Sequence, residues 1–415
     1  MNFVFLRQFS PSDLAVESGH ANLNLINKRT RFSVLCALLV ASAASQKNCV
    51  VPFGSSEHWD VFWPLIFKES GSLYPTEIVN GGGAVLVPAS DKVIVSCGPN
   101  FLKKQNSVKH PLTKVVVTCN DGEFESDTLE LRNIKDYGCD LRAVEAVLNP
   151  VHGCPAELMN VHFGFVHPVD GMSHITGEAC YNTKEGRTLF GHVRLGSEDA
   201  TSLRVVNTTF FRQTHPPSGY KTQFMKAFRL DEVNTRLRTL LNTENIPSLK
   251  MVNFIDDNLL YSPQLAATKK LEWNYFITHD NLFNLDLLKE DIHDIGQNVE
   301  IYVGAHGVYT AKNSAGANVP IFLDGDKFPV PEIVWFAVKR EDSATAFVVF
   351  NDPKITEIEI QTSSLCNSKC DQISWLKRVK MSGTILCCEY NDLRKNIREM
   401  PPYSIKRIDI LQSHV

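Results

Sequence analysis

Short apolar runs bounded by turn residues dominate the chain up to about residue 155. Lys92–Cys97 and Lys114–Cys119 are β-branched runs that each end in a cysteine, and Gly81–Pro88 is a glycine turn leading into an apolar run. Runs of this kind predict β-strands. We therefore expect residues 44–155 to form a small, disulfide-stapled, β-rich N-terminal domain.

The pattern changes from residue 156, where helical and strand periods mix. Leu230–Leu241 repeats apolar residues at helical spacing, with Asp231 and Glu232 near its start, where they complement the helix dipole. Leu285–Ile295 predicts a second helix, and the predicted strands include Val161–Val166, Val299–Val303, Ile333–Val338 and Ala346–Phe350. Because the predicted strands and helices do not alternate regularly as in βαβ units, residues 156–415 are predicted to form an α+β domain.

The first 43 residues have the order of a secretory leader. Three basic residues precede an apolar run, which is followed by small residues: Lys28, Arg29, Arg31, Phe32–Val40 and Ala41–Ala44. This order predicts a signal peptide and secretion, with a short buried segment as the alternative. No later apolar run reaches the length of about 18 residues that a membrane-spanning helix needs, so no membrane partner is expected.

Cysteine usage agrees with export. One of the 11 cysteines lies in the leader, which leaves an even set of ten and room for up to five disulfides. The alternative is a zinc site that combines Cys366 and Cys370 with the adjacent pair Cys387 and Cys388. Adjacent cysteines suit tetrahedral zinc poorly, so we favour disulfides.

Composition excludes a strongly basic nucleic-acid-binding protein. The chain has 415 residues, 43% of them hydrophobic and 21% charged, as in ordinary globular proteins. Without residues 1–43 there remain 38 basic and 44 acidic residues, a net charge of −6. Any surface that binds phosphate must therefore be a local patch.

Several blocks resemble, in order, the DNA/RNA non-specific endonucleases of insects. The C-terminal half contributes Phe163–Phe165, Cys180–Tyr181, Arg187–Phe190, Val299–Val308, Phe328–Trp335, Ala346–Pro353, Leu365–Trp375 and Gly383–Pro401. The N-terminal part resembles the family's non-catalytic leader domain at Pro64–Leu65 and Ser96–Gly98. The resemblance implies a ββα-metal fold, in which helices flank a central antiparallel sheet. It also implies a histidine base, a magnesium ion held by asparagine, and basic side chains at the phosphodiester.

The family's catalytic histidine has no counterpart. The run Asn258–Thr268 resembles the segment that follows that histidine, which places Val252 at the histidine and Lys250 at the family's arginine. A second register places Gln264 at the histidine and Ser262 at the arginine. Neither valine nor glutamine can accept a proton at neutral pH, so hydrolysis is predicted to be weak or absent.

Other histidines and the metal-binding arm leave alternatives open. No histidine lies between His215 and His279, and His279, His293 and His306 are the candidates for a displaced base. The resemblance places possible magnesium ligands at Asn284 and Glu290, near Asn274, but a Pro-Gln pair is missing and the spacing is two residues short. The alternative roles are a helix-capping asparagine and a helix-surface acid.

Basic and aromatic residues flank this region and predict nucleic-acid binding: Lys250, Lys269, Lys270, Arg236, Arg238 and Trp273. Solvated charges beside a buried aromatic strand are the alternative. We expect a secreted protein that binds DNA and RNA independently of sequence, similar to the salivary nuclease-like proteins of blood-feeding flies. The competing hypotheses are an active Mg-dependent endonuclease and an extracellular protein-binding scaffold.

Overall fold

The computed structural model describes most of the chain after the leader, namely residues 47–52, 63–79, 82–104, 112–126, 137–140, 145–149, 154, 158–182, 184–185, 187–195, 204–206, 229–255, 264, 275–280, 282–295, 299–341, 343–352, 354–379 and 385–402. Lys47–Val415 forms one compact unit. The predicted leader, residues 1–43, lies outside the described residues. Within the described part, no helix has both the length and the apolar character that a membrane crossing requires.

The N-terminal part consists of three small antiparallel sheets. The first contains β1 (Cys49–Pro52), β4 (Gly82–Val87) and β3 (Glu77–Val79), and the second contains β2 (Leu65–Lys68), β5 (Lys92–Ser96), β7 (Lys114–Asn120) and β8 (Glu123–Glu125). The third pairs β6 (Leu102–Lys104) with β9 (Tyr137–Cys139). Disulfides Cys49–Cys119 and Cys97–Cys139 join these sheets through one buried core. The β-rich, disulfide-stapled character expected here is therefore present.

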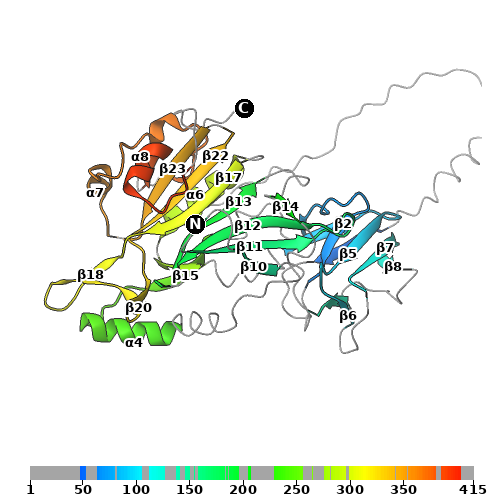
Figure 1. Cartoon of the computed structure of the whole chain (residues 1–415), viewed down its shortest axis with the longest axis horizontal. Helices are drawn as coiled ribbons and strands as arrows, with labels where there is room; N and C mark the ends of the chain where they lie inside the picture. Colours follow the sequence, from blue (N-terminus) through cyan, green and yellow to red (C-terminus); the bar gives the residue numbers. More distant parts are fainter. Residues whose placement is uncertain are drawn as a thin grey trace, which may run out of the picture. The chain divides into compact units, whose positions relative to one another are not determined.

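A nine-stranded antiparallel sheet forms the centre of the remaining chain (Figure 1). Its order is β10 (Glu145–Asn149), β11 (Met159–Val166), β12 (Ser173–Asn182), β13 (Arg187–Leu195), β17 (Val299–His306), β22 (Ile333–Arg340), β23 (Ser343–Phe350) and β24 (Ile385–Glu389), with β14 (Arg204–Val206) paired to β12. The strands predicted at Val161–Val166, Val299–Val303, Ile333–Val338 and Ala346–Phe350 all lie in this sheet, so those predictions are confirmed.

Both faces of the central sheet are covered, which explains why its inner strands are apolar throughout. Because alternate side chains of a strand point to opposite faces, Phe336 and Val338 of β22 pack with α6 (Phe283–Asp294) on one side. Trp335 and Ala337 pack on the other side with residues of α7 (Glu357–Gln361) and α8 (Tyr390–Asn396). The chain is thus mixed α+β with helices flanking an antiparallel sheet.

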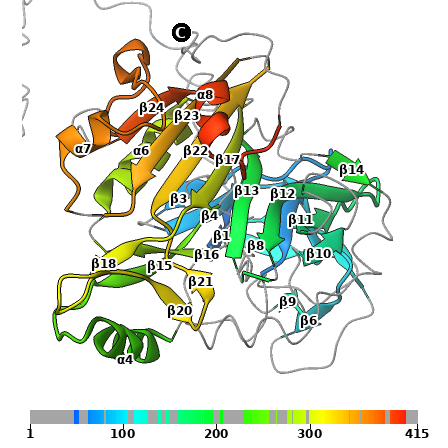
Figure 2. The same cartoon turned by 60° about the vertical axis from the view of Figure 1, so that its left-hand side comes forward.

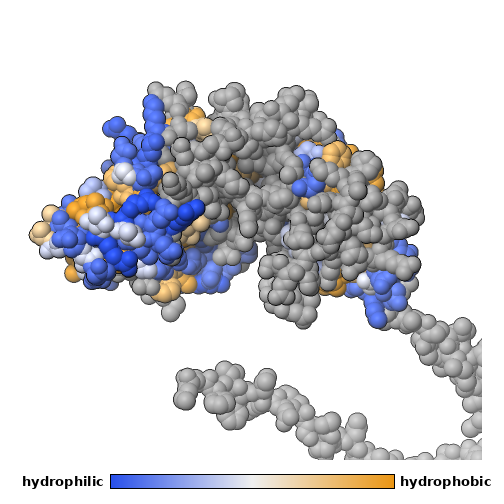
Figure 3. Space-filling model, turned by 90° about the horizontal axis from the view of Figure 1, so that it is seen from below, coloured by the Kyte–Doolittle hydropathy of each residue, from blue (hydrophilic) through white to orange (hydrophobic). Residues whose placement is uncertain are grey.

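A third group of elements surrounds a smaller core beside the sheet. It comprises α4 (Leu230–Leu241) and the hairpins β15 (Leu249–Asn253) with β16 (Tyr275–His279), β18 (Thr310–Lys312) with β19 (Asn318–Pro320), and β20 (Phe322–Asp324) with β21 (Lys327–Pro329). Figure 2 shows α4 beside these hairpins. Hydrophilic residues predominate over this part of the surface in Figure 3. Both predicted helices are present as α4 and α6.

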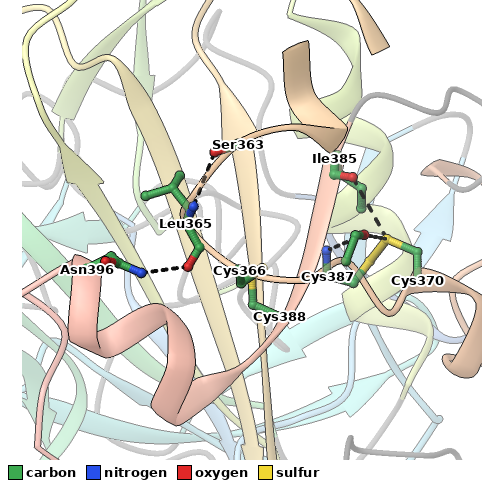
Figure 4. The surroundings of a disulfide bond; sticks show 9 residues. Ser363, Leu365, Cys366, Cys370, Ile385, Cys387, Cys388 and Asn396 are labelled. Carbon is green, nitrogen blue, oxygen red and sulfur yellow. Dashed lines mark hydrogen bonds between the residues drawn. A yellow bond between two sulfur atoms is a disulfide. The ribbon is translucent and has the colours of Figure 1, made fainter. Parts of the chain in front are cut away.

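Disulfides account for all four cysteines of the C-terminal part. Cys366–Cys388 and Cys370–Cys387 lie side by side in Figure 4, next to the short 3₁₀ turn η4 (Cys370–Gln372). The neighbours Cys387 and Cys388 take different partners because successive residues of β24 face opposite cores. With Cys154–Cys180, the described chain has five disulfides, and the zinc alternative is wrong because its ligands are consumed.

Candidate functional site

The region where the sequence placed the catalytic site is a strand–strand–helix unit. β15 and β16 form an antiparallel pair in which Val252 lies opposite Phe276. α6 follows after a short connection and buries Leu285, Leu288 and Ile292 in the same core as Phe276. The apolar periodicity of α6 thus fixes this helix between the hairpin and the central sheet, so that the polar side chains of α6 are held in defined directions.

None of the residues at the family's histidine position provides a base. Val252 is partly buried and packs against the core shared with α6. Gln264 is fully buried and is held by the N-terminal part: its Oε1 accepts from the Ile66 N–H at 2.7 Å, and its Nε2 donates to the carbonyls of Ile66 and Tyr74 at 3.2 and 2.6 Å. Gln264 is therefore a structural cross-link. Ser262, the arginine position of that second register, lies outside the described residues.

The two predicted magnesium ligands do not converge. Asn284 and Glu290 are six residues apart on α6, which separates their positions by about 9 Å along the helix axis and turns them to different faces. Glu290 is exposed and forms an ion pair with Arg378 at 3.3 Å. Between them, the fully buried Lys289 donates from Nζ to the carbonyl of Asn253 at 3.2 Å. Because their positions diverge along and around the helix, Asn284 and Glu290 are not placed to share one magnesium ion.

Acidic neighbours neutralise the predicted phosphate-binding residues that the structure describes. Lys250 lies 3.8 Å from Asp286 of α6. Arg236 pairs with Glu232 and, more weakly, with Asp324, and Arg238 pairs with Glu244 at 3.0 Å. Lys269, Lys270, Trp273 and Asn274 lie outside the described residues. The described members of the predicted set therefore do not form an open cationic patch.

A polar pocket of about 760 Å³ lies at the end of the β15–β16 hairpin where β15 begins and β16 ends. Its walls come from the end of α4, the start of β15, the end of β16, the β18–β19 hairpin and the segment after β23, and include Asn245, Ser248, His279, Asp280, Tyr309, Lys312, Asn313, Asp352 and Lys354. The β18–β19 hairpin is attached to α4 because the Ser314 N–H donates to the carbonyl of Leu241 at 3.0 Å. The pocket thus depends on elements far apart in sequence.

His279 is the buried titratable residue of this pocket. The residue is 5% exposed, and its Nε2 has no hydrogen-bond partner among the described residues. The ring meets Tyr309 edge-on, with 4.8 Å between the ring centroids. Burial lowers the pKa of His279 below its ordinary value, with partial compensation from the negative charge of Asp352. The imidazole is therefore neutral at neutral pH and can accept or donate one hydrogen bond.

Charges of both signs surround His279. Asp280 bonds to the Ser248 hydroxyl, and Asp352 also lines the pocket. Burial, together with Asp352, raises the pKa of Tyr309, so this phenol stays protonated and remains a donor. Lys312 and Lys354 line the same pocket, and neither has an ion-pair partner in the described part of the chain. Within the described part of the chain, these two ammonium groups have no acidic partner. In this they differ from Lys250, Arg236 and Arg238, which are each paired with a carboxylate.

The other two histidines considered as displaced bases lie elsewhere. His293 is half exposed on α6 and lies 3.8 Å from Asp294. His306, at the end of β17, lies 2.9 Å from Glu399, which also pairs with Arg187. Both therefore contact a neighbouring carboxylate, and neither lines the pocket.

No protein-family model matches the chain, and no curated protein matches it significantly.

Sequence reasoning had placed His279 near the site but missed Asp280, Tyr309, Lys312, Asp352 and Lys354. The available clue was the polar sequence Asn351-Asp352 directly after the apolar run of β23.

Proposed function

We propose that this is a secreted protein that binds DNA and RNA independently of sequence on a nuclease-like scaffold, with weak or no phosphodiester hydrolysis. The observation that carries this proposal is Val252 packed against the core where the family resemblance requires an imidazole. A water nucleophile without a suitably placed base loses about 10²–10⁴-fold in rate. The divergence of Asn284 and Glu290 on α6 supports the same conclusion, because hydrolysis in the family also requires a magnesium ion held on this arm.

Binding would use the pocket at the end of the β15–β16 hairpin. Lys312 and Lys354 have no acidic partner among the described residues, and Tyr309 and His279 supply neutral hydrogen-bonding groups beside them. Ammonium groups bind phosphate as point charges, and such contacts carry no sequence information. Asp280 and Asp352 limit the attraction, so we expect moderate affinity with a small number of phosphate contacts.

An active endonuclease is the second candidate, and one observation favours it. The Nε2 atom of His279 lacks a partner in the described structure, and its imidazole is kept neutral by burial, as a general base requires. His279 would then replace the histidine that Val252 does not provide. Substitution His279→Gln separates the two functions because it removes the base but keeps a hydrogen-bonding side chain.

The decisive experiment measures binding and cleavage on the same purified protein. Fluorescence anisotropy with single-stranded DNA, duplex DNA and RNA of equal length would be recorded from about 50 to about 200 mM salt, with chelator and with Mg²⁺. We expect the logarithm of the association constant to fall linearly with the logarithm of the salt concentration, with a slope of about one per phosphate contact. Binding that does not depend on salt, or no binding, would contradict the proposal and favour the protein-binding scaffold.

Paired variants test the role of the pocket. Lys312→Ala with Lys354→Ala should weaken binding about tenfold and lower the salt slope by about two. The control, Lys184→Ala with Lys377→Ala, changes the net charge equally at exposed lysines away from the pocket lining. Equal effects of the two pairs would exclude the pocket as the binding site. Mg-dependent cleavage by the wild type that His279→Gln abolishes would establish the second candidate.

A further inference from the structure

We infer that the turn between β11 and β12 is a binding site for one divalent transition-metal ion of the zinc class. His167 directly follows β11, Asp170 lies in the turn, and His174 is the second residue of β12. Atoms that could act as metal ligands on these three side chains all lie within 4.8 Å of one another. The inference concerns a separate place in the fold and does not depend on the proposed function.

The backbone of the turn fixes the spacing of the ligands. The His167 N–H donates to the carbonyl of Met172 at 2.8 Å, and the Gly171 N–H donates back to the carbonyl of His167 at 3.0 Å. Oδ1 of Asp170 accepts from the Met172 N–H at 2.7 Å, which orients the carboxylate. His174 lies opposite Phe165 in the β11–β12 ladder. A hairpin closed in this way holds both imidazoles on one side of the turn. The two side chains therefore lose little conformational freedom when a metal ion binds.

Each imidazole lies close to the Asp170 carboxylate, one beside each carboxylate oxygen. Nδ1 of His167 lies 3.1 Å from Oδ1 of Asp170, and Nε2 of His174 lies 3.2 Å from Oδ2 of Asp170. Two ligands at about 2.0–2.1 Å from a tetrahedral zinc ion are about 3.3 Å apart. Each imidazole is thus already at about ligand-to-ligand distance from Asp170, while the ligand atoms of all three side chains lie within 4.8 Å of one another.

The surroundings of His167 select the tautomer that a metal requires. Its Nε2 lies 2.6 Å from the carbonyl oxygen of Gly71, which can only accept, so Nε2 carries the proton. Nδ1 is then left with a lone pair towards Asp170, whose N–H makes a long contact to it at 3.3 Å. A ring N–H that donates to a backbone carbonyl is the usual support of a metal-binding imidazole.

Packing also holds both rings in place. The rings of His167 and His174 stack with 4.7 Å between centroids, Phe165 stacks on His174, and Phe67 meets His167 edge-on. Gly71 has φ of +96°, and a Cβ atom there would lie 2.7 Å from Cε1 of His167. A glycine is thus required for the carbonyl of residue 71 to approach the imidazole so closely.

The ligand set indicates the class of metal. Two imidazole nitrogens and one carboxylate favour Zn²⁺ and its neighbours Co²⁺, Ni²⁺ and Cu²⁺, whereas Mg²⁺ and Ca²⁺ favour oxygen ligands. The Asp170 side chain is 44% exposed, so water has access to complete the coordination. An ion here would link the β11–β12 turn to the turn at Gly71 in the N-terminal part, through the hydrogen bond of His167.

Substitutions that preserve shape test the site. Asp170→Asn keeps the turn-closing oxygen but removes the charge, and His174→Phe keeps the stacking but removes the ligand. His293→Gln on α6 serves as the control because it removes an exposed histidine far along the chain. Zinc binding would be measured by titration calorimetry on the untagged mature protein, and Co²⁺ binding by visible absorption. Circular dichroism would verify that each variant is folded.

We expect one zinc ion per chain for the wild type and for His293→Gln. Affinity should fall at least about tenfold in Asp170→Asn and be lost in His174→Phe, and only the proteins that bind zinc should show a rise in melting temperature. Mg²⁺ should not produce this rise. Absence of stoichiometric zinc binding in the wild type, or equal binding in all four proteins, would overturn the inference.

Discussion

Asn351 fixes the backbone of His279. Its Oδ1 accepts from the His279 N–H at 2.9 Å, and its Nδ2 donates to the carbonyls of Ile277 and Pro331 at 3.0 and 2.9 Å. One fully buried amide therefore ties the end of β16 to the segments that flank β22 and β23. Because the imidazole follows its backbone, Asn351 determines where His279 lies in the pocket.

Substitution Asn351→Leu should destabilise the protein by about 3 kcal/mol, because three buried backbone groups lose their partner. The free energy of unfolding from urea titration would measure this loss. Asn396→Ala, which removes one hydrogen bond from an exposed asparagine, should cost less than about 1 kcal/mol. Similar costs for the two variants would show that Asn351 is not a structural anchor.

Substitution Gln264→Leu should destabilise by a similar amount, about 3 kcal/mol, because it strands the polar backbone groups of Ile66 and Tyr74 that the amide satisfies. Urea unfolding is again the measurement. The control is Gln361→Leu, since Gln361 is exposed and bonds only to Glu357 among described contacts. A stability loss no greater than that of the control would contradict the cross-link.

Introducing a histidine at the family position should not create a nuclease. Val252→His with Lys250→Arg should cost about 1–2 kcal/mol, because a polar ring replaces a side chain packed on the core. Plasmid cleavage in Mg²⁺ should remain at the level of the parent, since Asn284 and Glu290 diverge on α6. Met251→His, on the exposed face of the same strand, is the matched control. Strong cleavage by the double variant alone would mean that the metal-binding arm, with Asn284 and Glu290 on α6, is intact.

Stability should depend on pH through His279. Its folded pKa lies below the ordinary value, so the unfolded state takes up a proton first as the pH falls. The stabilisation from the neutral folded imidazole is thus complete above the unfolded pKa of about 6.5 and is lost as the pH falls below it. Comparing free energies of unfolding at about pH 7.5 and about pH 5, His279→Gln should lose less stability than the wild type. An equal loss in both proteins would contradict the burial of an uncharged His279.

Local sequence determined the elements themselves. The helix predicted at Leu230–Leu241 has those bounds in the structure, and the β-branched runs Lys92–Cys97 and Lys114–Cys119 are strands. Apolar periodicity predicts these elements correctly because each helix or strand buries one face, and the spacing of its apolar residues follows that face. An even cysteine count likewise predicted disulfides, although it could not give the pairing.

Tertiary structure alone decided the charge pattern and the site. Sequence cannot reveal that Lys250 lies beside Asp286 or that Gln264 bonds to Ile66, because such partners are distant along the chain and their pairing depends on the approach of separate elements. The same holds for His279 and Lys312, which meet in one pocket only because the β18–β19 hairpin attaches to α4. Apolar spacing encodes which residues are buried, whereas the neighbours of a polar side chain are set by packing between elements.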